Sequence, residues 1–154
     1  MSYIEKLRAK IGNMRIILPG CCAFIRNEKG QILMQQRVHP HGKWGLPGGL
    51  MELGESAEEA IRREVMEETG LLLGKLTLFG VYSGEGYLCI AQNGDEFEVV
   101  TIVYTTDDYE GEVAVMDDES LSLEWRHPDN LPDNIANTHS QIIRDYSKRE
   151  GLIK

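Results

Sequence analysis

The sequence of 154 residues lacks the features that place a chain in a membrane, outside the cell or around a zinc ion. No apolar run approaches the roughly 20 residues that a transmembrane helix needs. Residues 1–10 have no apolar core of the kind found in secretory signals. The three cysteines, two of them adjacent at positions 21 and 22, have no zinc-binding spacing and predict reduced, buried thiols. We therefore expect a cytoplasmic protein.

Basic residues are also scarce, with 16 Lys and Arg against 25 Asp and Glu and a net charge of −9. Nucleic acid polymers and anionic membranes both attract positively charged surfaces, so neither is an expected partner. The chain has no internal repeat and no linker rich in proline or serine. Its length is that of one domain, which we expect to span residues 1–154.

Hydrophobic periodicity predicts both helices and strands. Helices are expected at 3–11, 56–69 and 134–148, and strands at 16–26, 31–38, 76–83, 96–106 and 120–126. The turn signal at 27–30 predicts that the first two strands pair as a hairpin. This mixture predicts an α/β fold, an α/β/α sandwich with a mixed β-sheet between helices.

The helix at 56–69 has an unusual distribution of charge. Ser56 and Glu59 form a capping-box pattern, and Gly70 stands where helices commonly end. At about 100° per residue, Glu64 and Glu68 lie in the middle of the arc that carries the apolar residues, and Glu67 lies at its edge. An acidic helix face is usually solvated, and that interpretation stays open here. Carboxylates on a packing face instead need a compensating cation, and oxygen ligands select Mg²⁺ or Mn²⁺.

Residues 49–71, GLMELGESAEEAIRREVMEETGL, resemble the Nudix box, G-x5-E-x7-R-E-U-x-E-E-x-G-U with U aliphatic. Every defined position is filled, by Gly49, Glu55, Arg63, Glu64, Val65, Glu67, Glu68, Gly70 and Leu71. The preceding WGLPGG and the later Glu124-Trp125 and Leu131-Pro132 also resemble this MutT-like family. The similarity extends over about residues 15–148.

The resemblance implies Mg²⁺-dependent or Mn²⁺-dependent hydrolysis of the pyrophosphate bond in a nucleoside diphosphate linked to another moiety. It implies that Glu64, Glu67 and Glu68 ligate the metal, with the Gly48 carbonyl as a further ligand. Arg63 would orient these glutamates, with Glu55 as its partner. A non-catalytic domain that binds a nucleotide or an ADP-ribose-type ligand is the alternative, although such domains typically lose a metal-binding glutamate.

Two assignments remain open in the sequence. The general base is either Glu64 or an acidic residue before the late strand, Glu119 or secondarily Asp118, unless residues 116–119 are a solvated loop. Arg37 either contacts a substrate phosphate or forms a surface ion pair.

The substrate is set by segments outside the box, which we expect at 37–44, 83–97 and 108–120. ADP-ribose, other nucleotide sugars, diadenosine polyphosphates and oxidised dNTPs all fit the reaction class. In a homodimer, the N-terminal helix and residues 83–97 are the expected interface.

Overall fold

The computed structural model describes residues 1–151, which form three helices and ten strands. The helices are α1 (Tyr3–Ile11), α2 (Ala57–Thr69) and α3 (Asn137–Arg149). The strands are β1 (Ile16–Ile25), β2 (Ile32–Arg37), β3 (Trp44–Gly45), β4 (Gly48–Leu50), β5 (Leu72–Leu73), β6 (Thr77–Tyr82), β7 (Leu88–Ile90), β8 (Glu96–Thr106), β9 (Tyr109–Glu110) and β10 (Ser120–Arg126). The longest of these helices have 13 residues, so none within 1–151 has the length or apolarity to cross a bilayer.

Strand β1 is an interior strand of a five-stranded mixed sheet, between β4 and β8. It pairs in parallel with β8 along its whole length, from Ile16 opposite Phe97 to Ile25 opposite Thr106, and antiparallel with β4. Strands β6 and β7 both pair antiparallel with β8. A second, antiparallel sheet has the order β10-β2-β3, and β5 pairs with β9.

The predicted hairpin between the first two strands is wrong, although both strands and the turn between them exist. Only Arg26 and Ile32, next to the turn, form a bridge, after which β1 and β2 enter different sheets. Side chains on both faces of β1 are buried from Cys21 to Ile25. Burial of both faces is typical of a strand in the interior of a sheet. Strand β1 accordingly has a partner on each edge, β4 on one and β8 on the other.

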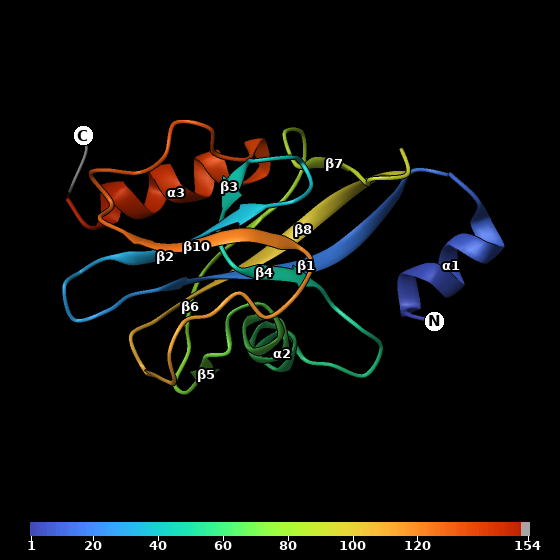
Figure 1. The fold of residues 1–154 in the computed structure, drawn as a ribbon. Helices are drawn as coiled ribbons and strands as arrows, with labels where there is room; N and C mark the ends of the chain where they lie inside the picture. Colours follow the sequence, from blue (N-terminus) through green and yellow to red (C-terminus); the bar gives the residue numbers. More distant parts are fainter. Residues whose placement is uncertain (152–154) are drawn as a thin grey trace.

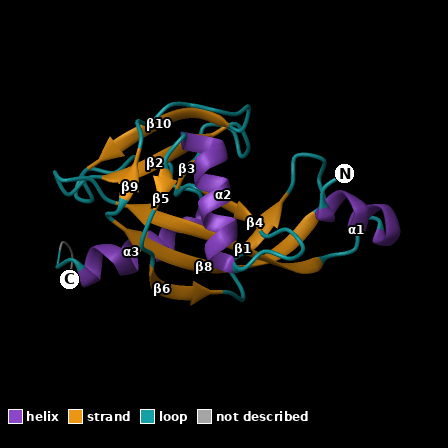
Figure 2. Cartoon of the chain, turned by 90° about the horizontal axis from the view of Figure 1, so that it is seen from below, coloured by secondary structure: helices purple, strands orange, loops and turns teal. Residues whose placement is uncertain are grey.

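The strands lie between two helices, as Figure 1 shows with α3 on one side of the sheets and α2 on the other. Alternate residues of β1 enter the two cores, Cys22 and Phe24 on the α3 side and Cys21, Ala23 and Ile25 on the α2 side. Seen from the α2 side, this helix crosses the face of the strands (Figure 2). The α/β/α sandwich with a mixed sheet is therefore confirmed. Cys21 and Cys22 are buried free thiols as predicted, whereas Cys89 is free but only partly buried, because it lies on the short strand β7.

Helix α1 lies at the opposite end of the molecule from α3 and has no buried residue (Figure 1). Polar contacts hold it in place. The Tyr3 amide donates to Glu52 Oε2 over 3.1 Å, and Arg8 donates to the Glu96 carbonyl over 2.9 Å. The expected helix at 3–11 is confirmed. Unlike α1, helix α2 packs against the strands.

Candidate active site

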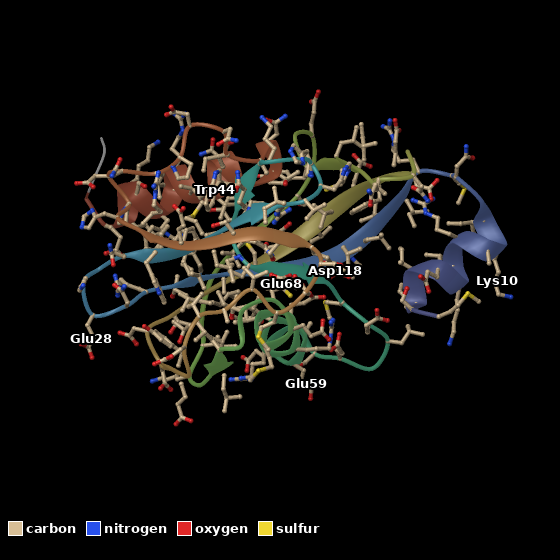
Figure 3. The ribbon with its side chains drawn as sticks, in the orientation of Figure 1. Lys10, Glu28, Trp44, Glu59, Glu68 and Asp118 are labelled. Carbon is tan, nitrogen blue, oxygen red and sulfur yellow. The ribbon has the colours of Figure 1, made fainter. Side chains whose placement is uncertain are left out.

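Local capping fixes both ends of α2. The Ser56 hydroxyl accepts a hydrogen bond from the Glu59 amide over 3.1 Å, and the Glu59 carboxylate accepts one from the Ser56 amide over 2.9 Å. Gly70 ends the helix in the left-handed conformation, with φ 79°. Glu59 lies on the outer side of α2, whereas Glu68 points toward the strands (Figure 3). The capping box fixes where α2 begins, and packing of Ala60, Ile61 and Val65 in the core turns the Glu68 side of the helix toward the strands.

Glu68 is buried, with 2% of its surface exposed, so it is not part of a solvated helix face. Its Oε2 accepts a hydrogen bond from Gln35 Nε2 over 3.0 Å and a weaker one from the Gly48 amide over 3.3 Å. Burial, and then the charge of Glu64, raise the pKa of Glu68. The prediction from helical periodicity that the Glu68 carboxylate lies on the packing face of the helix is confirmed.

Glu64 lies one helical turn before Glu68 and depends on the absence of a side chain at Gly49. A Cβ at Gly49 would lie 2.4 Å from the Glu64 carboxyl carbon, so any other residue there would displace the carboxylate. Burial raises the pKa of Glu64, and Arg63 opposes that rise. The third box glutamate, Glu67, has 56% of its side chain exposed at the rim of the cleft.

Arg63 connects α2 to Leu50 and Glu55, which precede this helix in the Nudix box. Its guanidinium grips the Glu55 carboxylate at two points, with distances of 2.6 and 2.9 Å. It also donates to Glu64 over 2.9 Å, to Glu67 over 3.3 Å and to the Leu50 carbonyl over 3.1 Å. The hydrogen bonds from Arg63 lower the pKa of Glu55, and Glu55 in turn raises that of Arg63. The expected pairing of Arg63 with Glu55 is present.

The loop before β10 brings two further carboxylates to Glu68. Oxygen atoms of Glu68, Asp117 and Glu119 all lie within 4.8 Å of one another, an arrangement that could hold a cation. Asp118, labelled with Glu68 in Figure 3, lines the same cleft without joining this cluster. Loss of hydration, Asp117 and Glu67 raise the pKa of Glu119. Sequence reasoning placed Glu119 here but missed Asp117.

Gln35 is the second residue that the sequence analysis missed. Its amide is buried on β2 and donates to both Glu68 and the Ser120 hydroxyl, the latter over 2.7 Å. Ser120 in turn donates to Asp117 over 3.2 Å. A polar residue in the otherwise apolar start of the strand, ILMQ, was the available signal. Gln35 therefore links the box helix to the loop before β10.

These side chains surround an open cleft of about 1070 Å³. All three segments that we expected to set the substrate contribute to its walls, through Val38 and His39, through Gln92, and through residues 116–119. Its acidic side is formed by α2 and residues 117–119.

Arg37 lines the same cleft from the end of β2. Its Nη2 donates to the Leu46 carbonyl over 3.2 Å and lies 3.3 Å from Nε2 of His139. No carboxylate within residues 1–151 comes within ion-pairing distance of it, so the surface ion-pair interpretation fails for the described chain. His139 is a further residue that sequence reasoning did not select.

Comparisons with known proteins agree with this geometry. The sequence model of the NUDIX domain matches residues 17–146. An ADP-ribose pyrophosphatase of Methanocaldococcus jannaschii is 35% identical over 80% of this chain and 69% of its own length. A putative 8-oxo-dGTP diphosphatase of Bacillus subtilis is 32% identical over 82% and 78% of the two chains.

Solved structures give the same result. The crystal structure of a MutT NUDIX hydrolase from Burkholderia pseudomallei superimposes with a TM-score of 0.70 and 32% identity. The match covers 83% of this chain and 96% of that one. The family model, the relatives and the fold all identify the same group of enzymes. The chain belongs to the Nudix family and is a pyrophosphohydrolase of nucleotide-derived substrates.

Proposed function

We propose that the protein hydrolyses the pyrophosphate bond of a nucleoside diphosphate linked to another moiety and uses Mg²⁺, with Mn²⁺ as a substitute. The observation that carries the proposal is the buried Glu68 carboxylate, which lies beside Glu64 and within 4.8 Å of oxygens of Asp117 and Glu119. A buried carboxylate beside other carboxylates costs free energy without a cation. All the ligand atoms that the cluster offers are oxygens, the type that Mg²⁺ prefers.

The box glutamates Glu64, Glu67 and Glu68 would hold the metal, with the Gly48 carbonyl as a further ligand. Arg63 would keep Glu64 and Glu67 oriented, because its guanidinium is already fixed by Glu55. When bound, the cation neutralises charge on the pyrophosphate and stabilises the charge that develops as the bond breaks. All three box glutamates are retained, which favours hydrolysis over the non-catalytic alternative.

In the reaction, water attacks one phosphorus, the bond from that phosphorus to the bridging oxygen breaks, and the phosphate ester leaves with that oxygen. A carboxylate accepts the water's proton. Glu64 and Glu119 are the two candidates, because both carboxylates line the cleft and both have a raised pKa. Arg37, which has no acidic partner within the described chain, would contact a phosphate of the substrate.

The relatives suggest where to look for the substrate. One is named an ADP-ribose pyrophosphatase and another a putative 8-oxo-dGTP diphosphatase. We therefore propose a panel of ADP-ribose, other nucleotide sugars, diadenosine polyphosphates and oxidised dNTPs, assayed for phosphate or phosphate-ester release with Mg²⁺.

Matched variants make that panel decisive. Glu67→Gln and Glu68→Gln should lose hydrolysis of whichever compound is cleaved. Glu58→Gln is the control, since Glu58 lies on the same helix with 55% of its side chain exposed, close to the 56% of Glu67. Full activity of Glu67→Gln and Glu68→Gln, or full turnover in excess chelator, would refute the proposal.

A further inference from the structure

Hydrogen-bond donors outnumber acceptors around His139, in the first turn of α3. The ring has 6% of its surface exposed, and burial together with Arg37 lowers the pKa of His139, so the ring is neutral. Its Nδ1 lies 2.9 Å from the Leu46 amide nitrogen, and its Nε2 lies 3.3 Å from Nη2 of Arg37. A neutral imidazole offers one lone pair and one N–H. Whichever nitrogen carries the proton, one neighbouring donor therefore faces an N–H instead of an acceptor.

Arg37 adds to this surplus. A guanidinium has five N–H donors and no acceptor. The Leu46 carbonyl accepts one of them over 3.2 Å. Its Nε is buried and has no hydrogen-bond partner within residues 1–151. The Arg37 guanidinium therefore lines the cleft with fewer hydrogen-bond acceptors around it than it has N–H donors.

The end of α3 is a third source of donors. Its N-cap residue is Ala136, and no side chain in the described part of the chain caps this end of the helix. The first amides of a helix lack i−4 partners and carry the positive end of the helix dipole; of these, the His139 amide already donates to the Ala136 carbonyl over 2.9 Å. Thr138 and His139, from this first turn, line a cavity of about 150 Å³. Arg37 and residues 48–50 line both this cavity and the main cleft, so the two lie side by side.

We propose that this smaller cavity, the donor cavity, is a subsite for a hydrogen-bond acceptor oxygen of the nucleotide, held between Arg37 and His139 at the start of α3. The inference deepens the proposed function and rests on it for the identity of the ligand as a nucleotide. Two parts of a nucleotide offer such an oxygen, a phosphoryl group and a carbonyl on the base. Either would satisfy the surplus donors without adding another N–H.

The first test follows the ring of His139 directly. The ¹⁵N and ¹H resonances of its side chain would be recorded while inorganic phosphate, AMP or GMP is added, none of which contains a pyrophosphate bond to hydrolyse. A shift with inorganic phosphate identifies a phosphoryl oxygen. A shift with GMP but not with AMP or phosphate identifies a base carbonyl. No shift with any of the three at millimolar concentrations would overturn the proposal.

The second test uses variants of the same residue. His139→Phe removes both ring nitrogens, and His139→Asn keeps an oxygen that can accept from the Leu46 amide. Both should raise KM for the nucleotide substrate, by about tenfold or more for a charged phosphoryl oxygen and by about two- to tenfold for a neutral base carbonyl. Ser140→Ala, on the exposed side of the same turn, is the control. Urea unfolding would show that each variant is folded.

The two proposals fail differently. If the wild-type protein cleaves a nucleotide and both folded His139 variants keep its KM, the donor cavity is not a substrate subsite. If the wild-type protein cleaves no compound of the panel, the proposed function fails, and the resonance shifts of His139 still decide whether the cavity accepts an oxygen.

Discussion

The cleft has two walls with opposite excesses. The acidic wall, formed by Glu64, Glu67, Glu68, Asp117 and Glu119, gathers five carboxylates around the buried Glu68. The donor wall, formed by Arg37, His139 and the first turn of α3, holds more N–H groups than acceptors. Each excess costs free energy on its own, because like charges repel one another in the acidic wall and a buried N–H of Arg37 lacks a partner within residues 1–151. A metal–nucleotide complex carries both a cation and acceptor oxygens, so it complements both walls.

Removing the central charge of the acidic wall should have the largest effect. We expect Glu68→Gln to lower kcat/KM by about 10³–10⁴-fold, because transition-state stabilisation by a metal is worth several kcal/mol and each tenfold corresponds to 1.36 kcal/mol. Steady-state hydrolysis with saturating Mg²⁺ checks this, with Glu58→Gln as the matched control. Near-normal activity would mean that the buried carboxylate serves only the fold.

The two candidate bases can be separated by comparing Glu119→Gln with Glu64→Gln. If Glu119 accepts the proton, its variant should lose about 10²–10⁴-fold in kcat with metal affinity little changed. If Glu64 is the base, its variant should lose both rate and metal affinity, since it is also a proposed ligand. The pH–rate profiles of both variants at saturating Mg²⁺ decide, and loss of the acidic limb only in Glu64→Gln would exclude Glu119.

Arg63→Lys tests whether the acidic wall needs geometry as well as charge. Lysine keeps the positive charge but loses the planar fork that grips Glu55 at two points while donating to Glu64. We expect kcat to fall by about tenfold or more and KM to change less, because the glutamates lose their orientation. Unchanged kcat would show that the fork is dispensable.

Gln35→Met should have a smaller effect and tests the link between helix and loop. Methionine has a similar length but cannot donate to Glu68 or Ser120, so the loop that carries Asp117 loses its connection to α2. We expect a decrease in kcat of about tenfold, the value of one or two hydrogen bonds to a charged group. Gln36→Met is the control, because the side chain of this neighbouring, half-buried residue donates to the Gly42 carbonyl and to no other group within residues 1–151. Equal activity of the two variants would contradict a positioning role for Gln35.

The last expected effect is on the stability of the metal-free protein, not on its activity, and it depends on pH. The pKa of Glu68 in the folded protein lies above its ordinary value near 4.5, so the folded state binds a proton that the unfolded state has released. The free energy of unfolding of the metal-free protein should therefore fall as pH rises above about 4.5, and Glu68→Gln should lack this loss. Urea unfolding at pH 4 and pH 7.5 should show a gain for the variant only at pH 7.5, of at least about 1.4 kcal/mol for a shift of one pKa unit. A gain that is equal at both pH values would contradict the raised pKa.

Local signals predicted the acidic wall better than the donor wall. The capping residues Ser56 and Gly70 and the rotation of Glu64 and Glu68 follow from helix geometry within one segment, so they could be found in the sequence. Arg37 and His139 lie about a hundred positions apart, and their surplus of donors exists only after folding. Nothing local in either segment indicates that the Leu46 amide points at the ring of His139.

The strand pairing shows the same limit. A short turn at residues 27–30 favours a hairpin, but β1 pairs with β8, about 80 positions further along the chain. The sequence contained the necessary clue in the adjacent Cys21 and Cys22, because burial of both faces favours an interior strand. The loop before β10 was anticipated only in part, since helical periodicity does not apply there and nothing distinguishes Asp117 from Asp118.

The central claim is that the acidic wall is a cation site centred on Glu68. Titration of Mn²⁺ followed by electron paramagnetic resonance, without nucleotide, tests it most directly because it needs no turnover. We predict that the wild-type protein and Glu58→Gln bind Mn²⁺ with equal affinity and that Glu68→Gln binds it at least tenfold more weakly. Equal Mn²⁺ affinity in all three proteins would contradict the account.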